Sequence, residues 1–378
     1  MKKYIAAIIV KGSDKMDILI YGAGKYCENL LKIVNHYTSV NVVGIADSNI
    51  HGEKYGYTIL DILDTQEKIF PEAVIVIAMA NASNALEIAR RLENKGYLKI
   101  YLYLNKRKTF INDFIEGECI PLNHLEDMIL PSIELHTVDF CNLNCKGCAH
   151  FSPLFEKKIP DFNIRIRDLF LLKELFCRIL MVSLLGGEPL LNPELHQYLI
   201  EARKYFPNEE IQIITNGILL LKVDDKLLKI ISENRITVVI SEYEPTHKII
   251  AKIEERLQKF QIDYSVREMG IKERFNRPLS IVANSRYNKK CISEGCTAIC
   301  DGKIARCPTL LYINKFNEKF GQTLPDYGIL DLMDYKDGQT LLNKLKEKVP
   351  LCKYCIDNEI KWEVCGKTIK IEDFAALD

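Results

Sequence analysis

The feature that most constrains this chain is a short loop with three cysteines, Cys141, Cys145 and Cys148. Three residues separate the first pair and two separate the second, so one loop can wrap a compact metal centre. Thiolates are the usual protein ligands of iron–sulfur clusters. A four-iron cluster held by only three thiols would leave one iron open to another molecule. The spacing therefore predicts a metal centre with an open coordination position.

The use of cysteine elsewhere agrees with a metal-binding chain rather than with a disulfide-bonded one. The chain has 13 cysteines, and an odd number does not form a complete disulfide framework. A second group with metal-like spacing comprises Cys291, Cys296, Cys300, Cys307, Cys352, Cys355 and Cys365. The isolated Cys27, Cys119 and Cys177 are expected to be small buried hydrophobic residues.

Composition sets broad limits on the function. The chain has 378 residues, of which 48% are hydrophobic and 27% charged, as in a globular protein of two or three domains. Lys plus Arg and Asp plus Glu are both 51, so no net positive field attracts nucleic acid or an anionic membrane. The apolar run after Lys3 is too short for a signal peptide, and residues 1–15 are expected to be an extra strand or a loose extension. No stretch reaches the length of a membrane span, so we expect a cytoplasmic protein.

The N-terminal hundred residues follow the order of a nucleotide-binding βαβ unit. An apolar strand at 18–21 leads to Gly22 and Gly24, a helix, and a second strand that ends at Asp47. Glycines let a phosphate approach a helix N-terminus, and an acidic residue here can bond a ribose hydroxyl. Cys27 stands where a third glycine would be. The segment resembles Rossmann-like N-terminal domains of sugar acyltransferases and nucleotide-sugar enzymes, which implies a nucleotide or nucleotide sugar; the alternative is a purely structural domain.

From residue 133 onward, strand-like and helix-like segments alternate, which predicts a parallel sheet with helical crossovers. Strands are expected at 133–138, 181–185, 211–215, 236–240 and near 262–267, with a possible sixth at 280–283. Helices are expected at about 164–180, 193–205, 225–233 and 247–260. Ligands of such sheets gather at the carboxyl ends of the strands.

Small and polar residues follow several of these strands, where they would meet on one rim. Cys141 follows the first strand, the run Gly186, Gly187, Glu188 and Pro189 follows the second, Asn216 the third, and Ser241 the fourth. Together with the cysteine loop, this set resembles the radical S-adenosylmethionine (SAM) superfamily. The resemblance implies that Cys141, Cys145 and Cys148 hold a four-iron four-sulfur cluster. It further implies that the other six residues surround SAM.

One departure from that family stands in the loop itself. The residue before the last cysteine is often aromatic in the family and helps to pack the adenine, whereas here it is Gly147. His150 and Phe151, just downstream, are candidates to compensate. For His150 the ordinary alternative is a polar loop residue.

The later cysteines resemble a twitch extension, the shortened relative of the SPASM extension of that family. The resemblance implies one auxiliary four-iron cluster held by Cys307, Cys352 and Cys355 together with Cys291 or Cys296. A structural zinc ion is the alternative occupant, because four cysteines with a close pair also suit a tetrahedral site.

The sequence therefore predicts an α/β chain: an N-terminal Rossmann-like parallel sheet, then a partial (β/α)6 barrel with a small Cys-rich C-terminal extension. The expected domains are 1–104, a linker 105–131, the barrel 132–285 and the extension 286–378. The resemblance implies reductive cleavage of SAM to a 5′-deoxyadenosyl radical, which abstracts hydrogen from a carbohydrate, nucleotide sugar or peptide. A flavodoxin- or ferredoxin-like protein would donate the electron, and no catalytic residue is assigned. The alternative is a non-catalytic iron–sulfur or zinc-binding scaffold or redox sensor.

Overall fold

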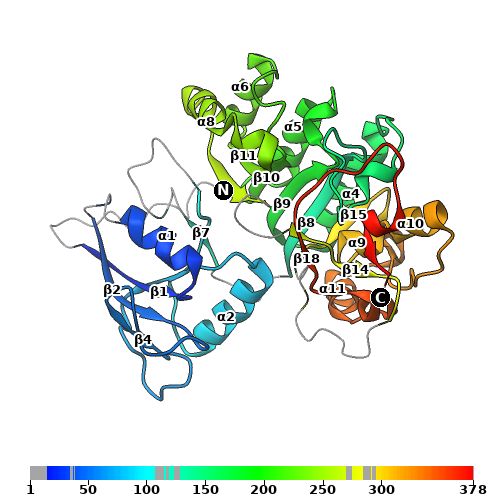
Figure 1. Cartoon of the computed structure of the whole chain (residues 1–378). Helices are drawn as coiled ribbons and strands as arrows, with labels where there is room; N and C mark the ends of the chain where they lie inside the picture. The colour runs from blue at the N-terminus through cyan, green and yellow to red at the C-terminus, as the bar shows by residue number, and fades with distance from the viewer. Residues whose placement is uncertain are drawn as a thin grey trace. The chain divides into compact units, whose positions relative to one another are not determined.

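A computed structural model of the protein describes residues 15–34, 37, 39–106, 115, 119–122, 128–269, 275–283, 291 and 295–377. Residues 1–14, and with them the expected N-terminal extension, lie outside the described residues. The chain divides into two compact units, and each is described by itself (Figure 1). The first unit comprises Met1–Asn105 and Phe110–Leu125. The second comprises Lys106–Thr109 and Glu126–Asp378.

The first unit is built on a mostly parallel sheet whose strands follow in the order β3-β4-β2-β1-β5-β6-β7. Its strands are β1 (Met16–Tyr21), β2 (Val40–Ala46), β3 (Glu53–Lys54), β4 (Tyr57–Leu60), β5 (Val74–Ile77), β6 (Ile100–Tyr103) and β7 (Cys119–Pro121). Its helices are α1 (Lys25–Val34) and α2 (Ala82–Asn94). The strands β1 and β5 are almost wholly buried because apolar residues occupy both faces, as expected for strands covered on both sides. The predicted Rossmann-like parallel sheet is confirmed.

The second unit contains five parallel strands that pair in chain order. They are β8 (Ile129–Val138), β9 (Arg178–Gly186), β10 (Glu210–Thr215), β11 (Thr237–Glu242) and β12 (Tyr264–Glu268). The crossover helices are α4 (Phe162–Leu175), α5 (Leu195–Tyr205), α6 (Asp225–Glu233), α7 (Glu244–His247) and α8 (Ile250–Lys259). Figure 1 shows these green strands and helices together on one side of the unit. The apolar sides of α4, α5, α6 and α8 join one core with the strands.

The remaining elements of the second unit are short, and most of them belong to the Cys-rich part of the chain. The strands are β13 (Phe275–Asn276), β14 (Leu279–Ser280), β15 (Ala298–Cys300), β16 (Lys303–Ala305), β17 (Leu330–Asp331), β18 (Glu359–Ile360) and β19 (Ala375–Ala376). The α-helices are α9 (Pro308–Leu311), α10 (Ile313–Phe320) and α11 (Gly338–Lys346). Five 3₁₀ turns complete the unit: η1 (Ser152–Leu154), η2 (Pro189–Leu191), η3 (Leu332–Asp334), η4 (Pro350–Tyr354) and η5 (Ile371–Asp373).

Four details differ from the sequence prediction. The segment expected as a sixth barrel strand supplies Leu279–Ser280, which pairs with β19 outside the main sheet. The other edge of the sheet is extended instead, because β15 pairs in parallel with β8 and is followed by β16 and β17. The first crossover helix ends at Leu175 rather than near residue 180. Residues 178–181 belong to β9 instead, because they pair with the early part of the ten-residue strand β8. The helix expected at 247–260 is divided into α7 and α8.

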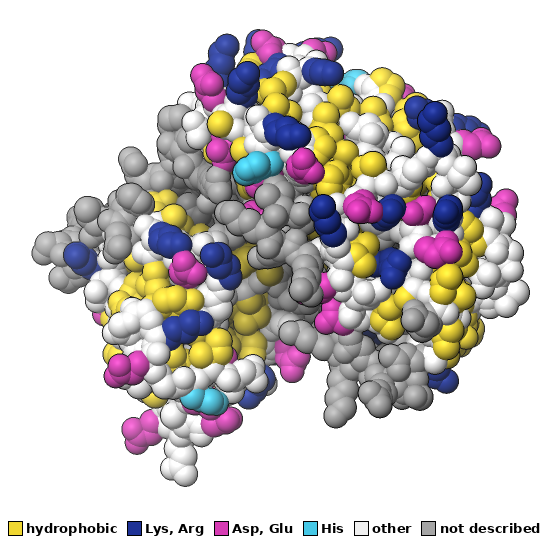
Figure 2. All heavy atoms as spheres, in the orientation of Figure 1, with side chains coloured by type: hydrophobic (Ala, Val, Ile, Leu, Met, Phe, Trp, Pro, Cys, Tyr) yellow, Lys and Arg dark blue, Asp and Glu magenta, His cyan; other side chains and the backbone are white. Residues whose placement is uncertain are grey.

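The shared sheet also bears on the domain boundaries. The short strands β15 and β16 belong to the expected extension, yet they join the sheet of the expected barrel. The limits proposed for a separate barrel and extension stay a prediction. Within the described residues, no helix combines the length and the apolar character needed to cross a bilayer. On the face seen in Figure 2, Lys and Arg side chains are interspersed with Asp and Glu.

Candidate functional site

The three thiols of the cysteine loop line one cavity of about 440 Å³ in the second unit. The cavity lies at the carboxyl ends of the parallel strands, where the glycines that end β9 and the polar residues that end β10 and β11 meet it. The residues predicted for the first cluster and for SAM that line it are Cys141, Cys145, Cys148, Gly186, Gly187, Asn216 and Ser241. The rim inferred from the sequence is therefore present as one concave surface.

The first glycines of the predicted SAM motif are required by packing. A Cβ on Gly186 would lie 1.8 Å from the carbonyl oxygen of Val138, and one on Gly187 would lie 1.9 Å from that of Phe140. Real Cβ atoms essentially never approach closer than 3.0 Å. Both glycines let the end of β9 lie directly against the backbone that enters the cysteine loop. The end of β9 thus fixes the position of Cys141.

Glu188 and Pro189 do not line the cavity. The carboxylate of Glu188 is buried and accepts hydrogen bonds from the Thr215 hydroxyl at 2.7 Å and the Asn216 N–H at 2.8 Å. It also accepts from the Leu190 N–H at 3.1 Å. Burial raises the pKa of Glu188 to about 7, although these donors oppose the rise. Its position indicates that Glu188 ties the ends of β9 and β10 together.

Asn216 connects the third strand to the cysteine loop. Its side-chain amide donates to Asn142 Oδ1 at 2.7 Å and lies 3.7 Å from the sulfur of Cys141. The Leu143 N–H points at the same sulfur from 3.4 Å. Burial raises the pKa of the Cys141 thiol to about 12, so without metal this thiol keeps its proton. Metal binding would displace that proton, as it does at other thiolate sites.

The presence of glycine at position 147, rather than an aromatic residue, has a structural reason. Gly147 has φ +69°, and a Cβ there would lie 3.2 Å from Arg277 Cβ and 3.3 Å from the Phe275 ring. Its N–H donates to the Asp373 carbonyl at 2.6 Å. An aromatic side chain at this position would displace β13. Phe275 itself lines the cavity instead.

The two downstream residues lie in different places. Phe151 is buried, packs against Phe316 and Phe374, and does not line the cavity, so the idea that it compensates for Gly147 is wrong. His150 does line the cavity, and its Nε2 atom lies 3.7 Å from Glu134 Oε2. His150 also hydrogen-bonds Cys148. It is therefore a neighbour of a predicted cluster ligand rather than an ordinary polar loop residue.

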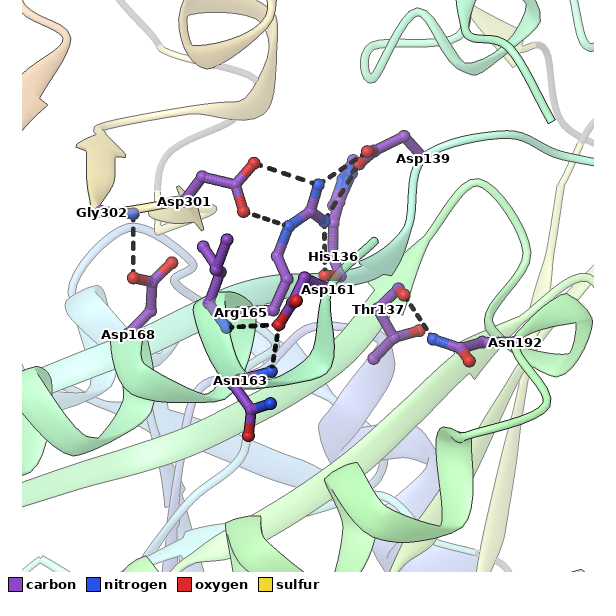
Figure 3. Close-up of polar contacts among 11 residues, drawn as sticks. His136, Thr137, Asp139, Asp161, Asn163, Arg165, Asp168, Asn192, Asp301 and Gly302 are labelled. Carbon is purple, nitrogen blue, oxygen red and sulfur yellow. Dashed lines mark hydrogen bonds and ion pairs between the residues drawn. The ribbon is translucent and has the colours of Figure 1, made fainter. Parts of the chain in front are cut away.

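Sequence reasoning missed a partly buried ion-pair network beside the loop, shown in Figure 3. Arg165 on α4 donates to Asp139 Oδ2 at 2.7 Å and to Asp301 Oδ1 at 2.6 Å. On the same helix, Asp168 accepts the Gly302 N–H at 2.9 Å. The network joins the turn between β15 and β16 to the residues that precede Cys141. Its signal in the sequence is the presence of charged residues among the apolar positions of α4.

The C-terminal cysteines form a second neighbourhood. The thiols of Cys307 and Cys355 each interact electrostatically with those of Cys291 and Cys352. Cys296 differs in two ways. Its strongest electrostatic interaction is with Glu134, to which it is also hydrogen-bonded. It also lines the cavity of the first cysteine loop. Cys307 is only a weaker neighbour of Cys296. This grouping favours Cys291 over Cys296 as the first auxiliary ligand.

The spread of these thiols bears on the kind of metal they suit. Among the described residues, no three His, Cys, Asp or Glu side chains are arranged to hold a single metal ion. A tetrahedral zinc ion needs its sulfurs about 2.3 Å from one point, whereas a four-iron cluster binds each thiolate at a different corner iron. The choice between a cluster and zinc stays a prediction.

In the first unit, the predicted nucleotide residues lie together at the ends of β1 and β2. Gly22 has φ +106°, and a Cβ there would lie 2.9 Å from the Ala78 carbonyl oxygen, so packing requires this glycine. Gly24 has nothing within 4 Å of an added Cβ. The Asp47 carboxylate accepts the Ala23 and Asn49 N–H groups, each at 2.8 Å. These bonds hold the turn in place.

Comparison with known families assigns the second unit. Residues 135–271 match the radical SAM superfamily. The chain carries a radical SAM domain. Residues 17–92 match the PglD N-terminal domain, which agrees with a separate N-terminal domain ahead of it. The predicted radical SAM membership is confirmed, whereas the SPASM or twitch assignment stays a prediction.

Several solved structures are similar to parts of the radical SAM chain. SuiB of Streptococcus suis bound to S-adenosylmethionine is 19% identical with a TM-score of 0.31, over 37% of this chain and 33% of that one. For anSMEcpe with bound AdoMet and Cp18Cys peptide, the identity is 21% and the TM-score 0.29, over 37% of this chain and 42% of that one. For BtrN in complex with AdoMet and 2-DOIA, the identity is 19% and the TM-score 0.41, over 64% of this chain and 97% of that one. The first two of these matches cover less than half of the SuiB and anSMEcpe chains. No curated protein is significantly similar to the chain.

Proposed function

We propose that this chain is a radical SAM enzyme whose first iron–sulfur site is the loop of Cys141, Cys145 and Cys148. The observation that carries the proposal is the convergence of these three thiols with the ends of β9, β10 and β11 on one cavity. N–H groups of Leu143 and Asn216 point at the sulfur of Cys141. Donors of this kind stabilise thiolate charge at iron–sulfur centres. The donor set therefore suits a cluster with one open iron.

When bound and reduced, such a cluster supplies the electron that cleaves SAM to methionine and a 5′-deoxyadenosyl radical, which takes a hydrogen atom from a substrate C–H bond. The protein's part is to hold and orient the two reactants. The backbone at Gly186 and Gly187 forms one wall of the cavity, while Asn216 and Ser241 offer polar groups from neighbouring strands. Tyr243 and Phe275 add aromatic surface that excludes water. We propose that a flavodoxin- or ferredoxin-like protein donates the electron.

Polar side chains in the lining of the cavity support a small hydroxyl- or amine-bearing substrate. Glu134, Arg267 and Asn276 line the cavity, and Glu134 Oε2 lies 3.7 Å from His150 Nε2. A carboxylate oxygen can accept more than one hydrogen bond, so a substrate hydroxyl or amine could also donate to it. We rank a carbohydrate or nucleotide-linked small molecule ahead of a peptide. A mass-shift search after reaction with pooled metabolites and peptides would decide between them.

For the Cys-rich part we propose one auxiliary four-iron cluster on Cys291, Cys307, Cys352 and Cys355. The mutual electrostatic interactions of these thiols support it. A Cys145→Ala variant is expected to lose the first cluster and SAM cleavage. A Cys355→Ala variant is expected to retain the first cluster and lose the auxiliary one. Zinc without sulfide in the purified protein would contradict both assignments.

A second proposal concerns the first unit, which would bind a nucleotide or nucleotide sugar at Gly22, Gly24 and Asp47. Gly24 supports it, because neither its backbone conformation nor its packing requires a glycine. A phosphate can use the free space above that backbone at the start of α1. Calorimetric titration with nucleotides and nucleotide sugars would test it, with Gly24→Val expected to abolish the heat of binding. Absence of binding to the native protein would leave the domain a purely structural role.

A further inference from the structure

The C-terminal residues 359–377, named here the C-terminal strap, lie outside the segment that matches the radical SAM superfamily. Nevertheless the strap is bonded to the backbone of the cysteine loop. The Lys146 N–H donates to the Glu363 carbonyl at 2.9 Å, and the Cys365 N–H donates to the Asn144 carbonyl at 2.8 Å. Lys146 also forms an ion pair with Glu363 at 2.8 Å. The strap is therefore held in register against the loop that carries the three thiols.

This register brings the indole of Trp362 to the sulfur of Cys145. The Trp362 Nε1–H donates to Cys145 Sγ at 3.2 Å. The indole ring is also fixed from the side, because it stacks on Tyr243 with centroids 5.3 Å apart and an interplanar angle of 30°. Tyr243 lines the cavity, and only 8% of Cys145 is exposed. The indole N–H is thus aimed at a sulfur that is nearly free of competing water.

A donor in this position acts on the charge of the site. Reduction of an iron–sulfur cluster adds negative charge, part of which resides on the ligand sulfurs. An N–H that points at such a sulfur stabilises the reduced form more than the oxidised form, which makes the reduction potential less negative. Shielding from water strengthens the interaction. The amide of Asn216 lies farther from its sulfur, at 3.7 Å, and therefore contributes less.

We propose that the C-terminal strap is part of the first iron–sulfur site, and that Trp362 is a positioning residue which raises the reduction potential of the cluster on that loop. The inference rests on the proposed function, because it requires a cluster at Cys141, Cys145 and Cys148. It adds a residue from outside the radical SAM domain, 217 positions from its partner cysteine. It also gives the strap a chemical role beyond closing the fold.

The first test compares the reduction potentials of two variants, followed by electron paramagnetic resonance (EPR) during redox titration. Trp362→Phe keeps an aromatic ring that can stack on Tyr243 but removes the N–H donor, together with one of the two fused rings. Val364→Ala is the matched control, because Val364 lies on the same strap and its residue surface is 46% exposed. The signal that changes on addition of SAM identifies the cluster of this loop. We expect a more negative potential in Trp362→Phe and no shift in Val364→Ala; equal potentials in fully loaded proteins would overturn the proposal.

A second test needs no substitution, because Trp362 is the only tryptophan in the chain. Protein grown with ¹⁵N-indole tryptophan carries the label at this site alone. In the native, reduced protein we expect a hyperfine coupling between the indole nitrogen and the SAM-responsive cluster, and loss of one exchangeable-proton coupling in Trp362→Phe. A loaded cluster without the nitrogen coupling would overturn the role of Trp362 and leave the proposed function intact. A native protein that binds no iron at the loop would instead overturn both.

Discussion

Substitution of Gly187 by alanine would test whether the end of β9 fixes the cysteine loop. The added Cβ would lie 1.9 Å from the Phe140 carbonyl oxygen, 2.2 Å from its carbonyl carbon and 2.7 Å from the Cys141 nitrogen. Each contact is shorter than the 3.0 Å limit for real Cβ atoms, and each partner is backbone that no rotamer change can remove. The loop or the strand must therefore shift by about 1 Å at Cys141, as overpacked sites do.

The expected cost follows from the same geometry. Overpacking of this kind costs about 1–3 kcal/mol, and alanine recovers up to about 1 kcal/mol by restricting the unfolded chain. A net loss of about 2 kcal/mol corresponds to a fall in Tm of about 4–8 °C for a unit of this size. Thermal unfolding of metal-free protein is the assay, because the clash does not involve the cluster. Iron content after reconstitution reports the displacement of Cys141.

The matched control is Gly366→Ala in the same unit. The nearest atom to an added Cβ there is the Thr368 carbonyl oxygen at 3.9 Å, an ordinary contact. This variant should keep the native Tm and iron content. If Gly187→Ala also kept both, packing would not be what holds the loop, and the structural explanation of the glycine pair would be refuted.

Two further variants test buried carboxylates. Burial raises the pKa of Asp168 to about 7, from a value near 4 in the unfolded chain. The folded state therefore prefers the neutral acid. The free energy of unfolding should fall by up to about 4 kcal/mol as the pH rises from 4 to 7. Asp168→Asn keeps an acceptor for Gly302, and its stability, measured by chemical unfolding, should not fall between pH 5 and pH 8. The exposed control Glu174→Gln should show the same fall as the native protein. A fall of the same size in Asp168→Asn would contradict the raised pKa of Asp168. Glu188→Gln should cost about 1–3 kcal/mol, because Thr215 and Asn216 donate to different oxygens of Glu188 and one of these becomes an NH2 group that cannot accept. Calorimetry with SAM on the reconstituted variant should also show weaker binding, and an unchanged affinity together with native stability would rule out the tie between β9 and β10.

Much of the candidate site could be predicted because its parts are local in the sequence. Cys141, Cys145 and Cys148 share one loop, and the motif at Gly186 directly follows an apolar strand. Parallel strands bring their carboxyl ends to one edge whatever the details of the helices. The sequence therefore indicates which residues meet at the rim without giving their separations.

The remaining parts depend on contacts between distant segments. The three residues of β15 are too few to show a strand period, so their pairing with β8 is decided by the open edge of the sheet. Trp362 reaches Cys145 only because the strap is in register with the loop. Arg165 and Asp168 look like surface charges until the turn at Asp301 supplies their partners. Such pairs are invisible to periodicity, because neither residue predicts the other.

The most direct test of the central claim uses the native protein, reconstituted with iron and sulfide without oxygen, reduced, and mixed with SAM. We expect 5′-deoxyadenosine and methionine as products, and neither from a Cys145→Ala variant handled in parallel. A fully loaded and reduced native protein that yields no 5′-deoxyadenosine, with and without pooled candidate substrates, would show that the chain is not a radical SAM enzyme. The chain would then be a non-catalytic iron–sulfur scaffold or redox sensor.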